Sequence, residues 1–123
     1  MKGYTVTIRE SSKELTARDK IKFKDVSAAN PLDQMVEVGK PLVIVPANYA
    51  ILDIHNEKSD NKDYTKYVIE DADGNLFTTG SESFFTTFQD IHADMCGEEY
   101  QLEIYKKPSK NYSGKHFITC TIV

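Results

Sequence analysis

The chain has 123 residues, of which 40% are hydrophobic and 28% are charged, and its formal net charge is −4. We expect a chain of this size and composition to fold as one soluble domain without support from a metal or a disulfide. The best apolar run, residues 41–45, is far too short to cross a membrane, and the N-terminus lacks the apolar core of a secretory signal. A cytoplasmic protein is therefore expected. The net acidity argues against coating of duplex DNA by bulk charge.

The first 48 residues are predicted to form an extension to the main fold. Ser11 and Glu14 fit a capping box, in which each side chain bonds a free backbone amide at a helix start. This pattern predicts a short helix that runs to about Lys20. The other expected elements of the extension are a strand over residues 4–8, a connector over 25–35 and an edge strand over 42–45, where flanking prolines exclude a central position.

From residue 49 onward the pattern is clearer. Alternation and β-branched or aromatic residues predict strands over residues 49–55, 64–70, 75–79, 100–105 and 116–122. A helix is predicted between the third and fourth of these strands, capped by Ser81 and ending near Gly97. Its core stripe is expected to comprise Phe84, Phe88, Ile91 and Met95.

This order of elements, β-β-β-α-β-β, is that of the OB-fold, a five-stranded Greek-key barrel with a helix between strands three and four. The predicted fold is therefore mainly β. It is a single domain in which an OB-fold barrel over residues 49–123 follows a strand and helix extension over residues 1–48. OB-folds bind ligands on strands two and three and on the loops that join strands one to two and four to five.

The loop between the last two predicted strands stands out by its composition. Residues 105–117 contain four lysines and three aromatic residues. These lysines contribute +4 to a net charge of −4, so the rest of the chain carries −8. Cations beside aromatic faces are typical of surfaces that follow a phosphate backbone and stack bases. The alternative is a solvated lysine-rich turn.

Two sets of residues are candidates for contact with a nucleic acid. Aromatic side chains could stack on bases, although one tyrosine of the second strand must point inward. Lysines could hold phosphates. The stacking candidates are Tyr64, Tyr67, Tyr112 and Phe117, and the phosphate candidates are Lys58, Lys62, Lys66, Lys106, Lys107, Lys110 and Lys115.

Catalytic and metal-binding patterns are weak in this sequence. His55, His92 and His116 lie far apart without a zinc-binding spacing, and a composite site of two of them with an acid is a minor alternative. The two cysteines fit no metal or redox motif. We therefore expect a protein that is not an enzyme and that needs no cofactor and no metal.

Several segments resemble small OB-fold single-stranded DNA-binding proteins of phages and conjugative elements from Gram-positive bacteria. They are residues 55–60, 79–84 and 107–115, ending in Phe117-Ile-Thr-Cys120, with residues 12–18 as further support. The resemblance covers about residues 45–123. It implies sequence-tolerant binding of single-stranded DNA during replication or transfer of a mobile element.

The resemblance leaves other partners open. Housekeeping bacterial single-strand binders carry an acidic C-terminal tail, whereas this sequence stops within a strand, so tail-mediated recruitment and the usual tetramer are in doubt. A homo-oligomer remains open. The alternative function is a non-catalytic module that binds proteins of a replication or conjugation complex.

Overall fold

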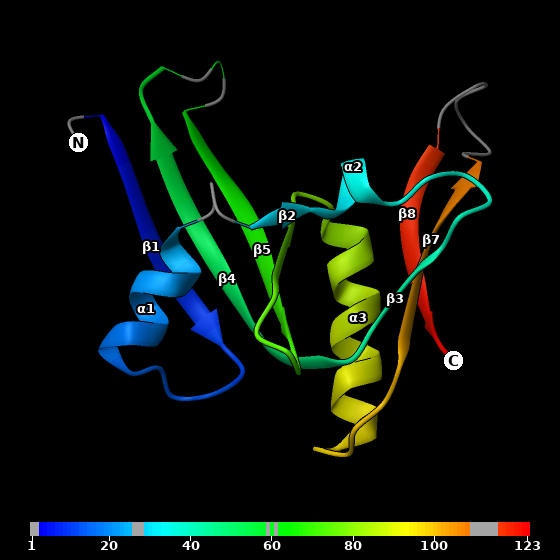
Figure 1. Cartoon of the computed structure of the whole chain (residues 1–123). Coiled ribbons are helices and arrows are strands. Elements are labelled where there is room, and N and C mark those ends of the chain that lie inside the picture. The colour runs from blue at the N-terminus through cyan, green and yellow to red at the C-terminus, as the bar shows by residue number, and fades with distance from the viewer. Residues whose placement is uncertain (1–2, 26–28, 59, 61, 109–115) are drawn as a thin grey trace. The chain divides into compact units, whose positions relative to one another are not determined.

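The computed structural model describes residues 3–25, 29–58, 60, 62–108 and 116–123, and its architecture is mainly β (Figure 1). The chain divides into two compact units, Met1–Asn30 with Ala47–Gly80 and Pro31–Pro46 with Ser81–Val123. The predicted extension, residues 1–48, is therefore shared between both units. No helix among the described residues is long and apolar enough to span a membrane.

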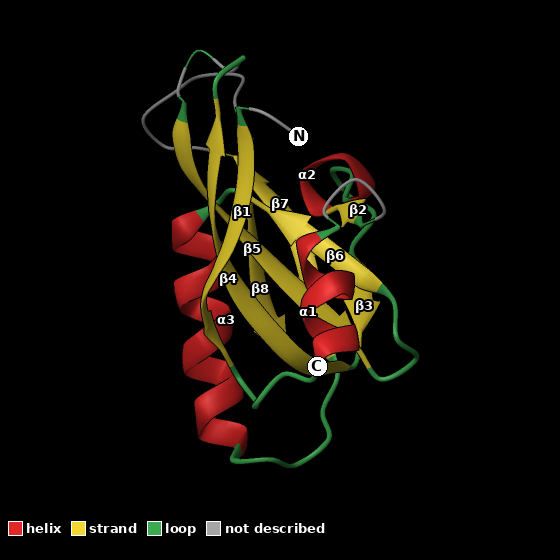
Figure 2. Cartoon of the chain, turned by 90° about the vertical axis from the view of Figure 1, so that its left-hand side faces the viewer, coloured by secondary structure: helices red, strands yellow, loops and turns green. Residues whose placement is uncertain are grey.

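The first unit is built on a five-stranded sheet with the order β1-β4-β5-β6-β2. Figure 2 shows β1, β4 and β5 as long neighbouring strands. The helix α1 (Ala17–Lys24) packs on one face of this sheet, because Phe23 is buried there with Leu52, Ile54 and Val68. The strands are β1 (Tyr4–Ser11), β2 (Asn30–Pro31), β4 (Pro46–Asn56), β5 (Asp63–Asp71) and β6 (Leu76–Thr79).

The start of α1 differs from the prediction. Ser11 is not a helix cap, because β1 continues through it and pairs it with Ala50 of β4. The capping box is formed instead by Thr16, whose hydroxyl accepts from the Asp19 amide at 3.2 Å, while the Asp19 carboxylate accepts from the Thr16 amide at 3.1 Å. The helix cap therefore lies five residues later than predicted, because Ser11 is held in the strand pairing of β1 with β4.

The second unit has a three-stranded sheet with the order β3-β7-β8, against which α3 (Glu82–Met95) packs through β8. The strands are β3 (Leu42–Ile44), β7 (Leu102–Pro108) and β8 (His116–Ile122), and α2 (Leu32–Met35) is a single turn. The edge position predicted for residues 42–45 is confirmed. The predicted connector over residues 25–35 instead contains β2 and α2, with Leu32 buried.

Helix α3 matches the sequence prediction closely. The Ser81 hydroxyl accepts from the Phe84 amide at 3.3 Å, so the predicted cap is confirmed. Phe84, Phe85 and Phe88 are buried, whereas Ile91 and Met95 at the far end of the stripe are only half-buried. The helix ends in two residues with left-handed backbone, Cys96 (φ 49°) and Gly97 (φ 88°).

The predicted closed barrel is not formed by the described residues. Its first three strands correspond to β4, β5 and β6, which belong to the five-stranded sheet, and its last two correspond to β7 and β8, which belong to the other sheet. β4 pairs with the N-terminal strand β1 along most of its length. The order of elements was thus predicted correctly, but the strands are divided between two sheets.

Candidate nucleic-acid interface

The outer face of the three-stranded sheet carries the most prominent residue of the sequence prediction, Phe117. Side chains alternate along β8, so Ile118 and Cys120 are buried, whereas the ring of Phe117 is 43% exposed. This outcome matches the predicted alternation of the last strand. The side chains that share the outer face by register are Val43, Glu103, Tyr105, Lys107, Phe117, Thr119 and Thr121.

Strand register places a lysine and two aromatic rings together on this face. Lys107 lies directly opposite Phe117, and Tyr105 lies opposite Thr119. Tyr105 and Phe117 are therefore diagonal neighbours, whose Cα atoms lie about 7–8 Å apart in an antiparallel pair. Lys107 is exposed and Tyr105 is half-buried. Together they offer two flat apolar surfaces and one ammonium group to a ligand.

Lys106 points away from this group. It is paired with the buried Ile118, and by alternation it lies on the opposite face of the sheet from Lys107. Three other predicted residues, Lys110, Tyr112 and Lys115, lie outside the described residues. The prediction did not include Tyr105 among the binding residues, although its alternation with Leu102 and Ile104 could have placed it beside Phe117.

The candidates from the second predicted strand lie in the first unit and do not form one surface. Tyr64 packs against the core beside Tyr4, whose pKa is raised by burial and, to a lesser extent, by the electrostatic effect of Tyr64. Tyr67 lies on the opposite face of β5 by alternation, so the expectation that one tyrosine points inward is confirmed. Lys66 shares the face of Tyr64 and is half-buried.

The two lysines near the loop after β4 differ in their contacts. The Lys62 ammonium group lies 3.2 Å from a Glu57 carboxylate oxygen, so its charge is already compensated. Lys58 is exposed, and its backbone amide donates to Asn56 at 3.0 Å.

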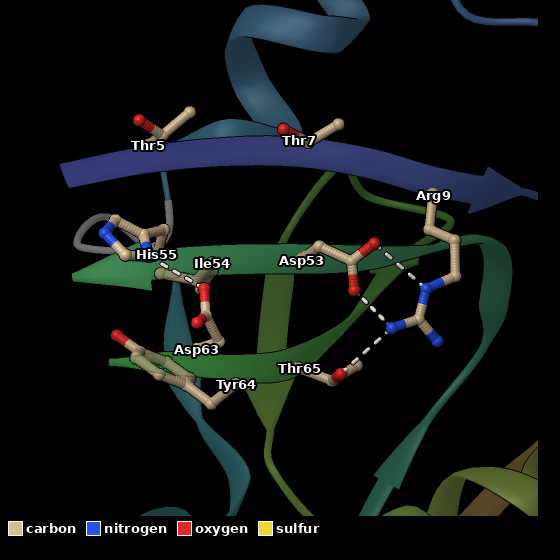
Figure 3. A pocket seen from close by; sticks show the side chains of 9 residues that line it. All are labelled: Thr5, Thr7, Arg9, Asp53, Ile54, His55, Asp63, Tyr64 and Thr65. Atoms are coloured by element: carbon tan, nitrogen blue, oxygen red, sulfur yellow. Dashed lines mark hydrogen bonds and ion pairs between the residues drawn. The ribbon is translucent and has the colours of Figure 1, made fainter. Parts of the chain in front are cut away.

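A separate polar pocket of about 440 Å³ lies on the other face of the first unit's sheet (Figure 3). Arg9 is the extra residue of a β-bulge between Ile8 and Glu10, and such a bulge redirects a side chain. Its guanidinium group donates twice to Asp53, once at 3.0 Å, and donates to Thr65 at 3.2 Å. These bonds hold the pKa of Asp53 below its ordinary value.

His55 completes this pocket at the end of β4. Its Nδ1 lies 2.7 Å from Asp63 and its Nε2 lies 2.6 Å from Glu57. Only the imidazolium form can donate to both carboxylates, and the bond to Asp63, followed by that to Glu57, raises the pKa of His55. Sequence reasoning missed these pairs, because Arg9 and Asp53, and likewise His55 and Asp63, come from different strands.

The pocket is therefore a set of ion pairs that join β1, β4 and β5. Arg9 and Lys62 already have carboxylate partners, and the described residues contain no group of His, Cys, Asp or Glu arranged to hold a metal ion. Of the two surfaces, the outer face of the β3-β7-β8 sheet is thus the better candidate for a nucleic-acid ligand. Comparison with known proteins found no matching family model, no matching curated protein and no matching solved structure.

Proposed function

We propose that this protein binds single-stranded DNA without catalysis, on the outer face of the β3-β7-β8 sheet. The observation that carries the proposal is the group of Tyr105, Lys107 and Phe117, which strand register brings together on an exposed sheet face. The two rings would stack on bases and the lysine would contact a phosphate. A sheet that presents aromatic side chains to unstacked bases is a recurrent solution in nucleic-acid recognition.

The energetics favour a single strand over a duplex. Stacking of one base on an aromatic side chain contributes about 1–3 kcal/mol, and it needs a base whose face is free of its neighbours. A duplex hides these faces in its own stack. Its affinity would depend on phosphate contacts, which a protein of net charge −4 is poorly equipped to supply.

The biological setting that we propose follows from the resemblance of the sequence to single-stranded DNA-binding proteins of phages and conjugative elements. The protein would coat DNA in the cytoplasm during replication or transfer of such an element. The order β4-β5-β6-α3-β7-β8 is that of the OB-fold, which supports a divergent relative of this fold whose strands divide between two sheets.

Fluorescence anisotropy with labelled oligo-dT and a matching duplex tests the proposal. We expect clear preference for the single strand at low salt, and a loss of about 5- to 150-fold in affinity for Phe117→Ala, which corresponds to one stacked base. Lys107→Gln should reduce the slope of log affinity against log salt by about 0.7, the value for one phosphate of a single strand. Equal binding to both probes would refute the proposal.

Two control variants accompany these measurements. Lys40→Gln removes an exposed lysine of the same unit that precedes β3 and pairs with Glu37 at 3.3 Å. Ile21→Ala removes an exposed apolar side chain from the other unit. Both should bind oligo-dT like the unaltered protein. If they lose as much affinity as Phe117→Ala, the site is not on this face.

A second candidate function is a module for protein interaction. It is favoured by Val43, which is 48% exposed on the same outer face and is paired with Glu103. An apolar side chain beside an acid suits a protein partner better than a phosphate backbone. Unchanged oligo-dT binding in Lys107→Glu, together with loss of a protein partner, would favour this function.

A further inference from the structure

The outward face of α1 combines positive charge with an exposed apolar side chain. Ala17, Lys20, Ile21 and Lys24 follow the i, i+3, i+4, i+7 spacing of one helix face, and all four are exposed. Ile21 is 72% exposed, and Phe23 alone among the α1 residues is buried. We call this surface, together with Arg18, the α1 face.

The cations of the α1 face have no internal role that would explain them. Within the described part of the chain, Lys13 pairs with Asp19 and Lys22 pairs with Glu70, whereas Arg18, Lys20 and Lys24 pair with no carboxylate. Lys20 and Lys24 are four residues apart, so they repel each other. Arg18 lies in the first helical turn, where the helix dipole disfavours positive charge.

The C-terminal end of α3 has the complementary character. Asp90, Asp94, Glu98 and Glu99 are exposed, and in the described residues none of them pairs with a cation. Asp94 lies in the last helical turn, where the dipole disfavours negative charge. Half-buried Ile91 and Met95 lie within one helical turn of these acids and could receive an apolar side chain. We call this surface the α3 end.

We propose that the α1 face of one copy binds the α3 end of a second copy. Ile21 would pack on Ile91 and Met95, while the three unpaired cations would face the four unpaired acids. Because the two surfaces differ, the contact is heterologous, so it can repeat from copy to copy and form a chain or a ring. It would give head-to-tail association on an otherwise acidic protein.

A protein occupant fits the α1 face better than a nucleic acid does. The exposed residues of α1 include no aromatic side chain, so bases would find no stacking surface there. Ile21, at the centre of the face, would gain nothing from phosphates, but it would gain from contact with apolar groups. The acids of the α3 end supply a partner of matching charge on the same chain.

Sedimentation velocity of the DNA-free full chain tests this contact by charge exchange. The average mass should rise with protein concentration at low salt and fall at high salt, because exposed charges are screened. Lys20→Glu/Lys24→Glu and Asp90→Lys/Asp94→Lys should each remain monomeric. An equimolar mixture of the two variants should associate, because the reversed faces match. Lys40→Glu/Lys58→Glu, with the same charge change elsewhere, should associate like the unaltered protein.

An uncharged variant guards against misfolding of the reversed ones. Ile21→Ser removes the apolar centre and should weaken association several-fold with unchanged circular dichroism. A protein that stays monomeric at all concentrations and low salt, or a mixture that does not associate, would overturn the proposal. No DNA is present, so this outcome is independent of whether the protein binds single strands.

Discussion

Phe23 is the side chain that holds α1 on the first unit, and its replacement by alanine tests how this short helix is stabilised. The ring is 1% exposed and packs with Ala50, Leu52, Ile54 and Val68. Truncation of a buried phenylalanine costs about 3–5 kcal/mol if the surrounding residues keep their places and leave a cavity. That is a large part of the roughly 5–15 kcal/mol by which a domain is stable.

A second outcome would reduce this cost. Helices shorter than about 12–15 residues are marginal in water, and α1 has eight. If α1 detaches in Phe23→Ala, the loss of global stability is limited to the free energy of helix docking. Amide hydrogen exchange separates the two cases, because detachment should remove protection in Ala17–Lys24 alone, whereas a cavity should lower it across β1, β4 and β5.

The assay is urea unfolding followed by circular dichroism, with Ile21→Ala as the matched control in the same helix. Ile21 is 72% exposed, so its truncation should change the free energy of unfolding by less than about 0.5 kcal/mol. We expect Phe23→Ala either to lower global stability by several kcal/mol or to lose protection within α1. Two variants with equal unfolding midpoints and intact protection of α1 would refute the reasoning.

Three further predictions concern the backbone and two histidines. Gly97→Ala should lower the free energy of unfolding by about 1–2 kcal/mol, because Gly97 has a φ of +88°, which is unfavourable for alanine. No atom lies within 4 Å of the added Cβ, so this cost would come from the backbone and not from a steric clash. An unchanged midpoint in urea unfolding would contradict this origin. The pKa of His55, measured by NMR titration, should lie above 6.5. The ion pairs of His55 should therefore contribute stability that is complete below pH 6.5 and is lost as the pH rises through the raised pKa. A titration midpoint at or below pH 6.5 would contradict the geometry. Burial lowers the pKa of His92, so stability should fall as pH drops below about 6.5, and His92→Phe should reduce that fall.

The His92 prediction has a structural basis in the packing of α3. The ring of His92 lies between those of Phe88 and Tyr100, with centroid distances of 5.4 and 5.8 Å, and Nδ1 lies 2.8 Å from the Tyr100 hydroxyl. Protonation would place a charge in this partly apolar setting. An equal pH dependence in His92→Phe and the unaltered protein would assign the acid sensitivity to other groups.

Local patterns in the sequence were sufficient to predict most of the regular elements. The alternation of β8, the Ser81 cap of α3 and the edge position of β3 follow from neighbours within a few residues, so no tertiary information was needed. The exposure of Phe117 was predictable for the same reason. The start of α1 was predicted wrongly, because the local capping pattern at Ser11 gave no sign that strand pairing would continue through this residue.

The sequence by itself therefore determined most of the strands and helices, although not β2 and α2, and which side chains of β8 face outward, since these depend on periods of two and 3.6 residues. Only the tertiary structure decided the pairing of β1 with β4, the division of strands into two sheets, and the ion pairs of Arg9 and His55. The pairing of β1 with β4 joins residues that lie 39 to 52 positions apart, from Ser11 with Ala50 to Tyr4 with Asn56. Alternation could place Tyr105 and Phe117 on the same face of the sheet, but only the cross-strand register made them diagonal neighbours.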